Sequence, residues 1–363
     1  LDATSIWDHV NSYSDMLTLT QAMRNGEIEV AIFHNVNPVF TLPAAADFGS
    51  ALDNVPFVVS TSSYPDETSA RAHIVLPTHT PLESWGDHRP GNGISGLMQP
   101  TMQPLFDTKH FGDVLLDIGR ALTVSSAPEE SGPEPESDLS QLPDGDFYEV
   151  LRDTWRKIQT TGNTPEVNDS TDAENIDFED YWASALRNGG IWDSTNEIPA
   201  TPIEAIGDLT NIGSDDHTEN DRPLTLVAYP SLHFYDGRGA NRPWLQEIPD
   251  PILKATWGSW AEMSPGTADS IGAVDGQLVS LETDYGSADA TVIVNNDMAD
   301  GIVAIPIGQG HTEFGRYAND RGINPMVVLN PTPETVSGGV RWAGTKVTAT
   351  PRDLHRPIPR LQN

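Results

Sequence analysis

The sequence predicts a parallel α/β region followed by a β-barrel region, joined by an acidic linker. Short apolar runs alternate with helix-like stretches through residues 1–123. Residues 124–221 are rich in Pro, Glu, Asp, Ser and Asn, a composition that buries little apolar surface. Residues 222–363 hold short strand patterns separated by turn residues, which is typical of a barrel. These patterns and the composition shift between them predict three domains with those boundaries.

In the first region, three apolar, β-branched runs are predicted as strands. They cover residues 29–34, 55–60 and 74–77. Helices are predicted at residues 14–25, 44–52 and 67–72. Strands alternating with helices indicate a parallel sheet, whose ligands lie at the carboxyl ends of the strands. The informative loops are therefore residues 35–43, 60–68 and 77–87.

The linker and the barrel carry predicted elements of their own. Two stretches of the linker, 147–158 and 178–186, have the pattern of amphipathic helices. Their aromatic residues, expected to pack on a neighbour, include Trp155, Tyr181 and Trp182. Barrel strands are predicted at 224–229, 278–283, 288–294 and 302–305.

Composition excludes several classes of protein. The chain has 363 residues and no cysteine, so it forms no disulfide, Cys-ligated zinc site or iron–sulfur cluster of its own. No apolar run approaches the ~20 residues that span a bilayer. A formal charge of -33, from 53 acidic and 20 basic residues, repels nucleic acid and anionic lipid. We therefore expect no nucleic-acid partner and no direct membrane insertion.

The acidic excess also bears on the solution in which the protein works. Lysine is scarce and occurs at Lys109, Lys157, Lys254 and Lys346. Such a surface suits high salt, where counterions screen the self-repulsion of the chain. A halophilic source and a merely acidic protein both fit these counts, and loss of the fold on dialysis to low salt would indicate the first.

The sequence holds no motif for independent catalysis. Gly-x-Ser-x-Gly elbows, Walker loops and paired nucleophile and base are absent, so no catalytic residue is assigned. No metal site is predicted, because the histidines match no zinc-ligand spacing; they include His73, His79, His88 and His110. The chain opens on Leu1 rather than Met, and we expect an internal cut or a processed chain.

Several separated segments form specific motifs. Residues 64–77 read Tyr-Pro-Asp-Glu-Thr-Ser-Ala-Arg-Ala-His-Ile-Val-Leu-Pro, and residues 82–87 read Leu-Glu-Ser-Trp-Gly-Asp. Residues 34–38 form a His-Asn-Val-Asn-Pro turn after a predicted strand. In the barrel region the motifs lie at residues 235–251, 257–268, 308–318 and 322–325. Together they resemble the molybdopterin oxidoreductase superfamily of the dimethyl sulfoxide reductase type. The similarity is nearest to polysulfide reductase, the membrane quinone reductase complex and alternative complex III.

The chain departs from the family pattern at two positions. Asn35 replaces a glycine of the family's turn, and we expect the turn to survive because Asn tolerates the left-handed backbone conformation. His73 replaces the family's usual Asp, and in this the chain resembles the branch that contains polysulfide reductase and the quinone-linked complexes.

The resemblance implies a Rossmann-like α/β domain and a double-psi-type barrel that binds a dinucleotide. The implied cofactor is molybdopterin guanine dinucleotide with molybdenum or tungsten, in a bis-pterin form. The metal ligand and an iron–sulfur cluster are expected in a missing N-terminal part of the large subunit. The other implied partners are an iron–sulfur electron-transfer subunit and a membrane-anchor subunit. The chain would be a peripheral, soluble subunit of a membrane-associated complex, on a side that its residues do not identify.

The same motifs nominate a set of cofactor-binding residues. A pterin guanine dinucleotide needs backbone amides in tight turns, an Arg for its phosphates, and carboxylates or amides for its rings. The candidates that the resemblance implies are Asn35, Asn37, Asp66, Glu67, Thr68, Glu83, Asn241, Trp244, His311, Gly315, Arg316 and Asn324.

The charged candidates each have a structural alternative. Arg316 would fork onto phosphate oxygens or simply occupy the surface of a turn, and His311 would hydrogen-bond a pterin or phosphate. Asp66 and Glu83 would accept hydrogen bonds from guanine N–H groups, or serve as a helix N-cap and a solvated loop carboxylate.

The amide and aromatic candidates are also open. Asn37 and Asn241 suit ribose or pterin edges, but Asn stabilises turns without a ligand. Tryptophans of a barrel usually fill its core rather than stack on a ligand, and these are Trp244, Trp257, Trp260 and Trp342.

The leading hypothesis is that the chain forms the distal half of a cofactor cleft in an electron-transferring oxidoreductase. The rival hypothesis is a scaffold subunit of a quinone-linked respiratory complex that keeps the fold and has lost the cofactor. Molybdenum or tungsten in the purified complex separates the two. The substrate is not specified by residues of this segment.

Overall fold

The computed structural model describes residues 10–91, 94–125, 143, 145–160, 176–192 and 222–361. Much of the predicted linker lies outside these residues. The described residues divide into two compact units. The first, which we call the insert unit, holds residue 10 and the described residues from 76 to 192. The second, the barrel unit, holds residues 11–75 and 222–361 and is therefore discontinuous in sequence. The domain boundaries expected at residues 123 and 221 stay a prediction.

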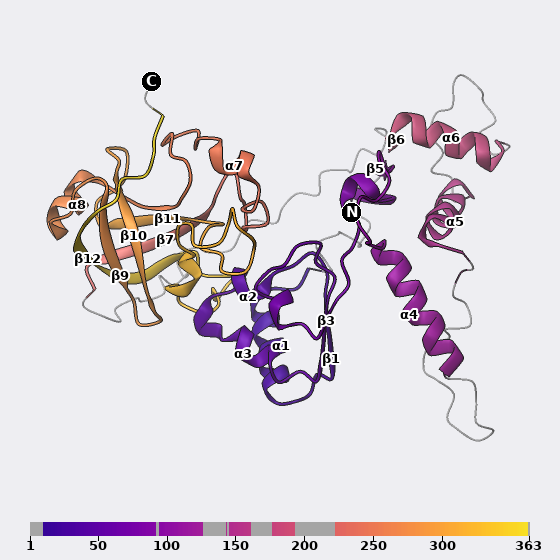
Figure 1. Ribbon diagram of the computed structural model, residues 1–363, viewed down its shortest axis with the longest axis horizontal. Coiled ribbons are helices and arrows are strands. Elements are labelled where there is room, and N and C mark those ends of the chain that lie inside the picture. The colour runs from indigo at the N-terminus through magenta and orange to yellow at the C-terminus, as the bar shows by residue number, and fades with distance from the viewer. Residues whose placement is uncertain are drawn as a thin grey trace, which may run out of the picture. The chain divides into compact units, whose positions relative to one another are not determined.

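A parallel sheet forms one layer of the barrel unit (Figure 1). Strands β1 (Val30–Phe33), β2 (Phe57–Ser60) and β3 (Ile74–Val75) pair in that order, and both pairs are parallel, which confirms the predicted sheet. Helices α1 (Tyr13–Arg24), α2 (Pro38–Thr41) and α3 (Phe48–Leu52) belong to the same layer. A hydrophobic core joins α1 and α3 to one face of the sheet and includes Met23, Phe33, Phe48, Leu52 and Val58.

Local backbone geometry explains how the helices differ from prediction. The helix predicted at residues 44–52 is split into a 3-10 turn, Ala44–Ala46, and α3, because Asp47 adopts a φ of 56° between them. The helix predicted at 67–72 is reduced to a 3-10 turn, Ser69–Arg71. Helix α1 is present as predicted. Ser12 caps it by accepting from the Asp15 amide, and the Asp15 carboxylate accepts in return from Ser12.

Six strands close into a barrel in the order β10-β8-β11-β7-β12-β9. Their bounds are β7 (Leu224–Pro230), β8 (Trp260–Met263), β9 (Gln277–Glu282), β10 (Ser287–Val294), β11 (Ile302–Ile307) and β12 (Ala343–His355). The pairs β7–β11 and β8–β10 are parallel, and the other ladders are antiparallel. All four predicted strands are confirmed, whereas β8 and β12 were not predicted.

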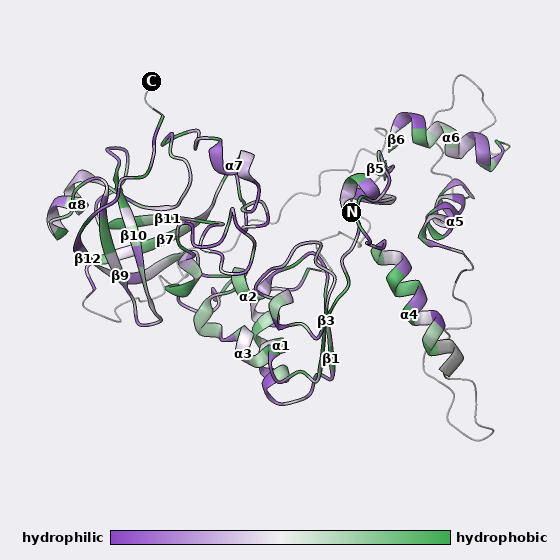
Figure 2. Cartoon of the chain, in the orientation of Figure 1, coloured by the Kyte–Doolittle hydropathy of each residue, from purple (hydrophilic) through white to green (hydrophobic). Residues whose placement is uncertain are grey.

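The barrel interior is apolar, and it is the largest core of this unit. Burial alternates along β7, where Leu224, Leu226 and Ala228 point inward. Figure 2 colours much of the barrel strands and of helices α1 to α3 as hydrophobic. Short helices α7 (Pro243–Glu247) and α8 (Pro265–Ile271) and a 3-10 turn, Pro325–Val327, lie in the connections.

In its described residues, the insert unit combines a small antiparallel sheet with three helices and one 3-10 turn, Pro81–Glu83. The strands are β4 (Gly86–Gly91), β5 (Ile94–Met98) and β6 (Gly190–Trp192). Both predicted helices are confirmed as α5 (Phe147–Thr160) and α6 (Phe178–Asn188), and α4 (Phe111–Ser125) was not predicted. As expected, their aromatic side chains are buried in one core: Trp155, Tyr181 and Trp182.

No helix within the described ranges is long and apolar enough to cross a membrane.

Candidate functional site

The parallel pairing of β7 and β11 places the loops that follow both strands at one end of the barrel, which we call the barrel mouth. The first mouth loop covers residues 231–242 and the second covers 308–324. Both loops turn sharply on glycines with positive φ, 106° at Gly237, 106° at Gly308 and 90° at Gly310. The second loop carries most of the barrel residues that the motifs nominated.

Gly237 permits a close approach between the two mouth loops and α2. A Cβ at this position would lie 2.6 Å from Nε2 of His311 and 2.6 Å from Cε1 of Phe40. Any side chain would therefore displace the His311 ring. Glycine is therefore required at position 237 for two reasons, its positive φ and its close contact with His311 and Phe40.

A buried network, which we call the latch, joins the α/β layer to the second mouth loop. Oε1 of Glu67 accepts hydrogen bonds from the backbone amides of Thr312 at 2.7 Å and Glu313 at 3.2 Å. Nδ1 of His311 lies 3.1 Å from the same oxygen. Oε2 of Glu67 accepts from the Asn37 side chain at 2.7 Å. Protein donors thus surround both oxygens of a carboxylate that is 9% exposed.

His311 is held on both faces and at both nitrogens. Its ring stacks on Phe40 with centroids 3.6 Å apart and on Phe314 at 4.6 Å. Nε2 lies 3.2 Å from the carbonyl oxygen of Gly237. Each ring nitrogen therefore faces an oxygen atom of the protein, and these contacts fix the orientation of the ring.

The latch changes the acidity of Glu67. Burial alone would raise the pKa of this carboxyl, but the hydrogen bond and charge of His311 and the donors on Asn37 and Thr312 lower it to about 2. The carboxylate is therefore charged over the whole physiological range. It holds the second mouth loop by several charge-assisted hydrogen bonds.

Other nominated residues of this unit support the same contact. Oδ1 of Asn37 accepts from the amide and hydroxyl of Thr68 at 3.2 and 2.7 Å. Asn324 donates to the carbonyl oxygen of Phe40 at 2.8 Å, which ties the second mouth loop to α2. Asp66 is buried and caps the turn after it by accepting from the Ser69 amide at 2.6 Å.

Asn35 adopts a φ of 53°, which confirms that it takes the left-handed conformation where the family has glycine. Its amide nitrogen lies 3.1 Å from Nε2 of His34. Asn35 is therefore engaged by a neighbour within its own turn.

The remaining barrel candidates lie along the two mouth loops. Oδ1 of Asn241 accepts from the Tyr317 amide at 3.2 Å, and a Cβ on Gly315 would meet Nδ2 of Asn241 at 2.5 Å. Arg316 is exposed, with its guanidinium 4.5 Å from the Tyr317 ring centroid. Trp244, on α7, is 81% exposed. Arg316 and Trp244 are thus the candidates that present their functional groups to solvent.

Glu83 lies in the insert unit, where it caps a turn. It accepts from the amide and hydroxyl of Thr80 at 2.9 and 3.0 Å and from the Leu105 amide at 2.9 Å. The backbone donors of Thr80 and Leu105 lower the pKa of Glu83 below its usual range. Its carboxylate therefore stabilises the loop that follows β3.

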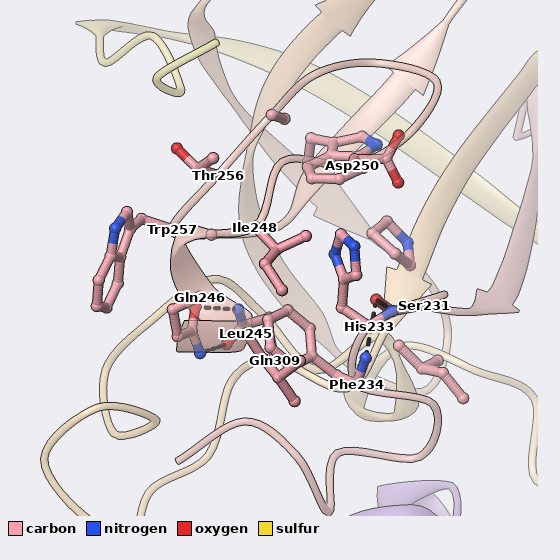
Figure 3. Close-up of a pocket in the computed structure, with 15 residues that line it drawn as sticks. Ser231, His233, Phe234, Leu245, Gln246, Ile248, Asp250, Thr256, Trp257 and Gln309 are labelled. Atoms are coloured by element: carbon pink, nitrogen blue, oxygen red, sulfur yellow. Dashed lines mark hydrogen bonds between the residues drawn. The ribbon is translucent and has the colours of Figure 1, made fainter. Parts of the chain in front are cut away.

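A hollow at the barrel mouth, which we call the mouth pocket, is lined by residues of both mouth loops and of the segment after α7 (Figure 3). Gln246 and Gln309 form its floor of paired amides. Each amide nitrogen donates to the other residue's oxygen, at 3.2 and 2.7 Å, and Gln246 also donates to the Ala240 carbonyl at 2.7 Å. Both side chains are buried, so this pair joins the segment after the first loop to the second loop.

The lining of the mouth pocket combines polar and aromatic side chains. Oδ1 of Asp250 accepts from the amides of Ile252 and Leu253, which leaves Oδ2 with no hydrogen-bond partner among the described residues. The indole rings of Trp257 and Trp260 line the same hollow. Trp257 takes a φ of 55°, and the Arg321 guanidinium lies 4.7 Å from its ring centroid.

Sequence reasoning placed these pocket residues inside a motif without nominating them. Asp250 is the penultimate residue of the segment 235–251, and Trp257 begins the segment 257–268. Nothing in the spacing indicates which side chains turn toward the hollow. The available signal was the Pro-Asp-Pro turn at 249–251, which fixes a carboxylate at a chain reversal.

No group of three or more His, Asp or Glu side chains among the described residues could hold a metal ion. The barrel mouth offers hydrogen-bonding groups, aromatic rings and the exposed guanidinium groups of Arg238, Arg242 and Arg316.

Comparisons with known proteins agree on what this region resembles. Residues 226–342 match the family described as Molydopterin dinucleotide binding domain. The menaquinone reductase, molybdopterin-binding-like subunit, of Nitratidesulfovibrio vulgaris is 24% identical over 347 residues, or 92% of this chain and 44% of the relative. The arsenate respiratory reductase molybdopterin-containing subunit ArrA of a Shewanella species is 25% identical over 351 residues, or 82% of this chain and 41% of the relative.

A solved structure has the same fold. The acetylene hydratase of Pelobacter acetylenicus matches with a TM-score of 0.60 at 15% identity, over 93% of this chain and 46% of that protein. The chain spans less than half the length of each of these three proteins.

Proposed function

Because this chain belongs to the molybdopterin oxidoreductase superfamily of the dimethyl sulfoxide reductase type, we propose that it binds molybdopterin guanine dinucleotide as the C-terminal part of a large subunit. One observation carries the proposal. The dinucleotide-binding match, residues 226–342, spans strands β7 to β11, both mouth loops and the mouth pocket. The part of the chain that matches the family is thus the part that contains the mouth pocket, with its polar and aromatic lining.

The residues of the mouth pocket fit the rings of this cofactor. Guanine and pterin share an edge of N–H and amino donors, and a carboxylate oxygen such as Oδ2 of Asp250 accepts from such donors. Trp257 supplies an aromatic face, whereas Trp260 is packed in a core with Ala255 and Ile293. These residues would hold one ring system. The exposed Arg316 guanidinium would pair with phosphate oxygens, and the exposed Trp244 indole would cover a ring or ribose.

The latch residues would act by position. Asn37, Glu67, Thr68 and His311 bond to one another or to the mouth loop, so they fix the loop that carries Arg316. Asn35, Asp66, Asn241, Gly315 and Asn324 fix the neighbouring turns. Glu83 caps a loop within the insert unit and is not assigned a contact with the cofactor. When bound, the cofactor supplies the redox chemistry, and this chain supplies binding and electrostatics.

We also propose the finer fold assignments. The six-stranded barrel with two parallel pairs, β7–β11 and β8–β10, supports a double-psi type. The parallel order β1-β2-β3 supports a Rossmann-like layer, extended by strands outside this chain.

The setting that we propose is a membrane-associated respiratory complex. The Nitratidesulfovibrio relative is named as a subunit of a menaquinone reductase and the Shewanella relative as one of an arsenate respiratory reductase. By this likeness, a peripheral large subunit would work with an iron–sulfur subunit and a membrane anchor. Its metal ligand and its own cluster would lie in polypeptide beyond this chain, which holds no cysteine.

Elemental analysis of the purified complex tests the proposal. We expect molybdenum or tungsten in a fixed ratio to the subunit, retained through gel filtration. A complex that is intact, with all of its subunits, yet free of both metals would overturn the proposal and assign the chain to the cofactor-free scaffold. Metal content does not identify the substrate class.

A further inference from the structure

The segment after β12, residues 356–361, joins the barrel to the rim of the mouth pocket, and we call it the strap. Its first residue is fixed on the barrel. The Arg356 amide donates to the carbonyl oxygen of Gly276 at 2.8 Å, and the Arg356 carbonyl oxygen accepts from the Thr291 hydroxyl at 3.2 Å. Gly276 directly precedes β9 and Thr291 belongs to β10, so the strap begins on two neighbouring barrel strands.

The other end of the strap pairs with residues 250–257, which we call the rim segment. The carbonyl oxygen of Pro359 accepts from the Thr256 amide at 3.0 Å and from the Thr256 hydroxyl at 3.4 Å. The Leu361 amide donates to the carbonyl oxygen of Lys254 at 3.0 Å. Backbone hydrogen bonds thus join the two segments at two separate points.

Two side chains of the strap support this pairing. Ile358 packs against a small core that contains Ala255 and Trp260, and both of these residues also line the mouth pocket. Nη2 of Arg360 lies 2.7 Å from Oδ1 of Asp275, which is close to the start of β9. Because an ion pair at the surface contributes little, we expect the apolar contact of Ile358 to be the stronger support.

The rim segment supplies the mouth pocket with Asp250, Ala255, Thr256 and Trp257 (Figure 3). The Asp250 amide donates to the Ala255 carbonyl oxygen at 2.8 Å, so the turn that carries the free carboxylate oxygen closes on the residue that is bridged to Arg360. Among the described residues, the hydrogen bonds of residues 251–256 run either within this turn or to the strap. The strap is therefore their hydrogen-bonded connection to the rest of the barrel.

The rim segment is held in an unfavourable backbone conformation. Lys254 and Trp257 have φ angles of 59° and 55°, in the left-handed region that residues other than glycine seldom occupy. Such conformations persist only where the surrounding structure holds them. Leu361 bonds to Lys254 itself, and Pro359 bonds to Thr256, the residue before Trp257. The contacts of the strap thus lie at or beside both strained residues.

We propose that the strap is a positioning element of the mouth pocket, which holds the rim segment so that Asp250 and Trp257 retain the guanine nucleotide end of the cofactor. The inference rests on the proposed function and deepens it. The strap lies outside residues 226–342, so the match to the dinucleotide-binding family does not include it. Ile358 and Leu361 act through the rim segment and touch no cofactor atom.

Two pairs of matched variants test the proposal in the purified complex. Ile358→Asp removes the apolar support, and Leu354→Asp makes a similar change on β12 at a side chain that is 53% exposed. Leu361→Pro removes the amide that donates to Lys254, whereas Leu361→Ala keeps it. Guanine nucleotide that remains bound is followed over time by gel filtration, acid hydrolysis and chromatography. Hydrogen exchange of peptides from the rim segment, β7 and β11 is measured by mass spectrometry on the same samples.

The expected result for Ile358→Asp and Leu361→Pro is exchange in the rim segment on the order of tenfold faster, with β7 and β11 unchanged. Loss of guanine nucleotide should also be on the order of tenfold faster, as when outer contacts that orient binding groups are removed. Both control variants should match wild type.

Three results would overturn the role of the strap while the wild-type complex holds its nucleotide. They are rim exchange at the wild-type rate, faster rim exchange with nucleotide retained as in wild type, and faster exchange in β7 and β11 as well, which would indicate general destabilisation. Equal effects of the control variants would have the same meaning. A wild-type complex without guanine nucleotide would instead overturn the proposed function, and retention by the strap with it.

Discussion

Glu67 is the residue on which the barrel mouth depends. Its two oxygens accept from Asn37, His311, Thr312 and Glu313, which bridge 245 residues of sequence between Glu67 and Thr312. Removing one side chain of such a buried network leaves the remaining donors or acceptors without a hydrogen bond, which costs free energy. The residue therefore acts on the site through the loop that it holds.

Replacing Glu67 with Gln should destabilise the protein and change its response to acid. We expect a loss of about 2–4 kcal/mol in the free energy of unfolding at neutral pH, because Gln presents a donor where the carboxylate accepted. The folded pKa of about 2 lies below the ordinary value of 4.5. The stabilisation is therefore complete above about pH 4.5 and is lost as the pH falls toward 2.

Urea unfolding from pH 7 down to pH 3 measures this effect. The difference between wild type and Glu67→Gln should shrink as the pH falls. Glu247→Gln, a change at an exposed carboxylate, should stay within about 0.5 kcal/mol of wild type. A gap that is constant with pH would contradict the role given to the carboxylate charge.

Gly237 offers a second test at the same scale. Gly237→Ala adds a Cβ at 2.6 Å from both Phe40 and His311, at a φ of 106°. Gly301→Ala also has a positive φ, 80°, but its Cβ meets nothing within 4 Å. We expect the Gly237 variant to be less stable than the Gly301 variant by about 1–3 kcal/mol in urea unfolding, from overpacking. Equal losses would mean that the clash relaxes freely.

Motifs identified some of the site residues but not what they contact. Asn37, Glu67, Thr68 and His311 were all nominated, and they do lie together. Sequence spacing does not tell whether a buried polar residue faces a ligand or another residue of its own chain. Here most of these donors and acceptors are satisfied within the protein. Asp250 was missed for the converse reason, because its free oxygen is visible only once the turn around it is known.

At the scale of elements, the barrel mouth is built by loops after two neighbouring parallel strands. β7 and β11 pair over six residues of each strand, from Ile302↔Thr225 to Ile307↔Pro230, so the loops that follow start side by side. The Gln246–Gln309 amide pair then fixes the segment after one loop to the start of the other. The shape of the mouth pocket follows from this connection.

A double-mutant cycle on the amide pair measures that connection. Gln246→Ala and Gln309→Ala each leave a buried amide without its partner, so the double variant should be more stable than the sum of the single losses predicts. We expect a coupling energy of about 0.5–3 kcal/mol from thermal or urea unfolding. Strictly additive losses would show that the two amides do not support each other.

Elements with strong periodicity were predicted from the sequence, and irregular ones were not. Strands β7, β9, β10 and β11 alternate or run apolar, and each was predicted within a few residues. β8 carries Glu262 among its buried residues, and β12 contains Gly344, Lys346 and Pro351, so neither has a clear strand pattern. Closure of the barrel stabilises β8 and β12 despite their low strand propensity, because each of them pairs with a strand on both sides.

At the scale of the whole molecule, charge and chain length dominate. The excess of 53 acidic over 20 basic residues destabilises any compact state through self-repulsion. The barrel unit is assembled from two stretches of sequence separated by the insert unit, an arrangement that composition could not predict. Composition changes near residues 123 and 221, where polar and acidic residues become frequent, whereas the compact units divide near residue 76, where packing contacts change.

Added salt should stabilise this protein. The Debye screening length falls from about 10 Å at an ionic strength of 0.1 M to about 3 Å at 1 M, which weakens the repulsion between surface carboxylates. We expect the melting temperature in differential scanning fluorimetry to rise steadily with the concentration of potassium chloride. A melting temperature that is flat or falling with salt would contradict the expectation of a halophilic protein.

The most direct test of the account is whether the barrel mouth retains a guanine nucleotide. Acid hydrolysis of the purified complex should release guanosine monophosphate, quantified by chromatography, in proportion to the subunit. Asp250→Asn keeps the turn-capping Oδ1 but replaces the free acceptor, so its complex should release far less, whereas Asp269→Asn, at an exposed helix position outside the mouth pocket, should match wild type. No guanine nucleotide from the wild-type complex, or equal release from the Asp250 variant, would contradict the account.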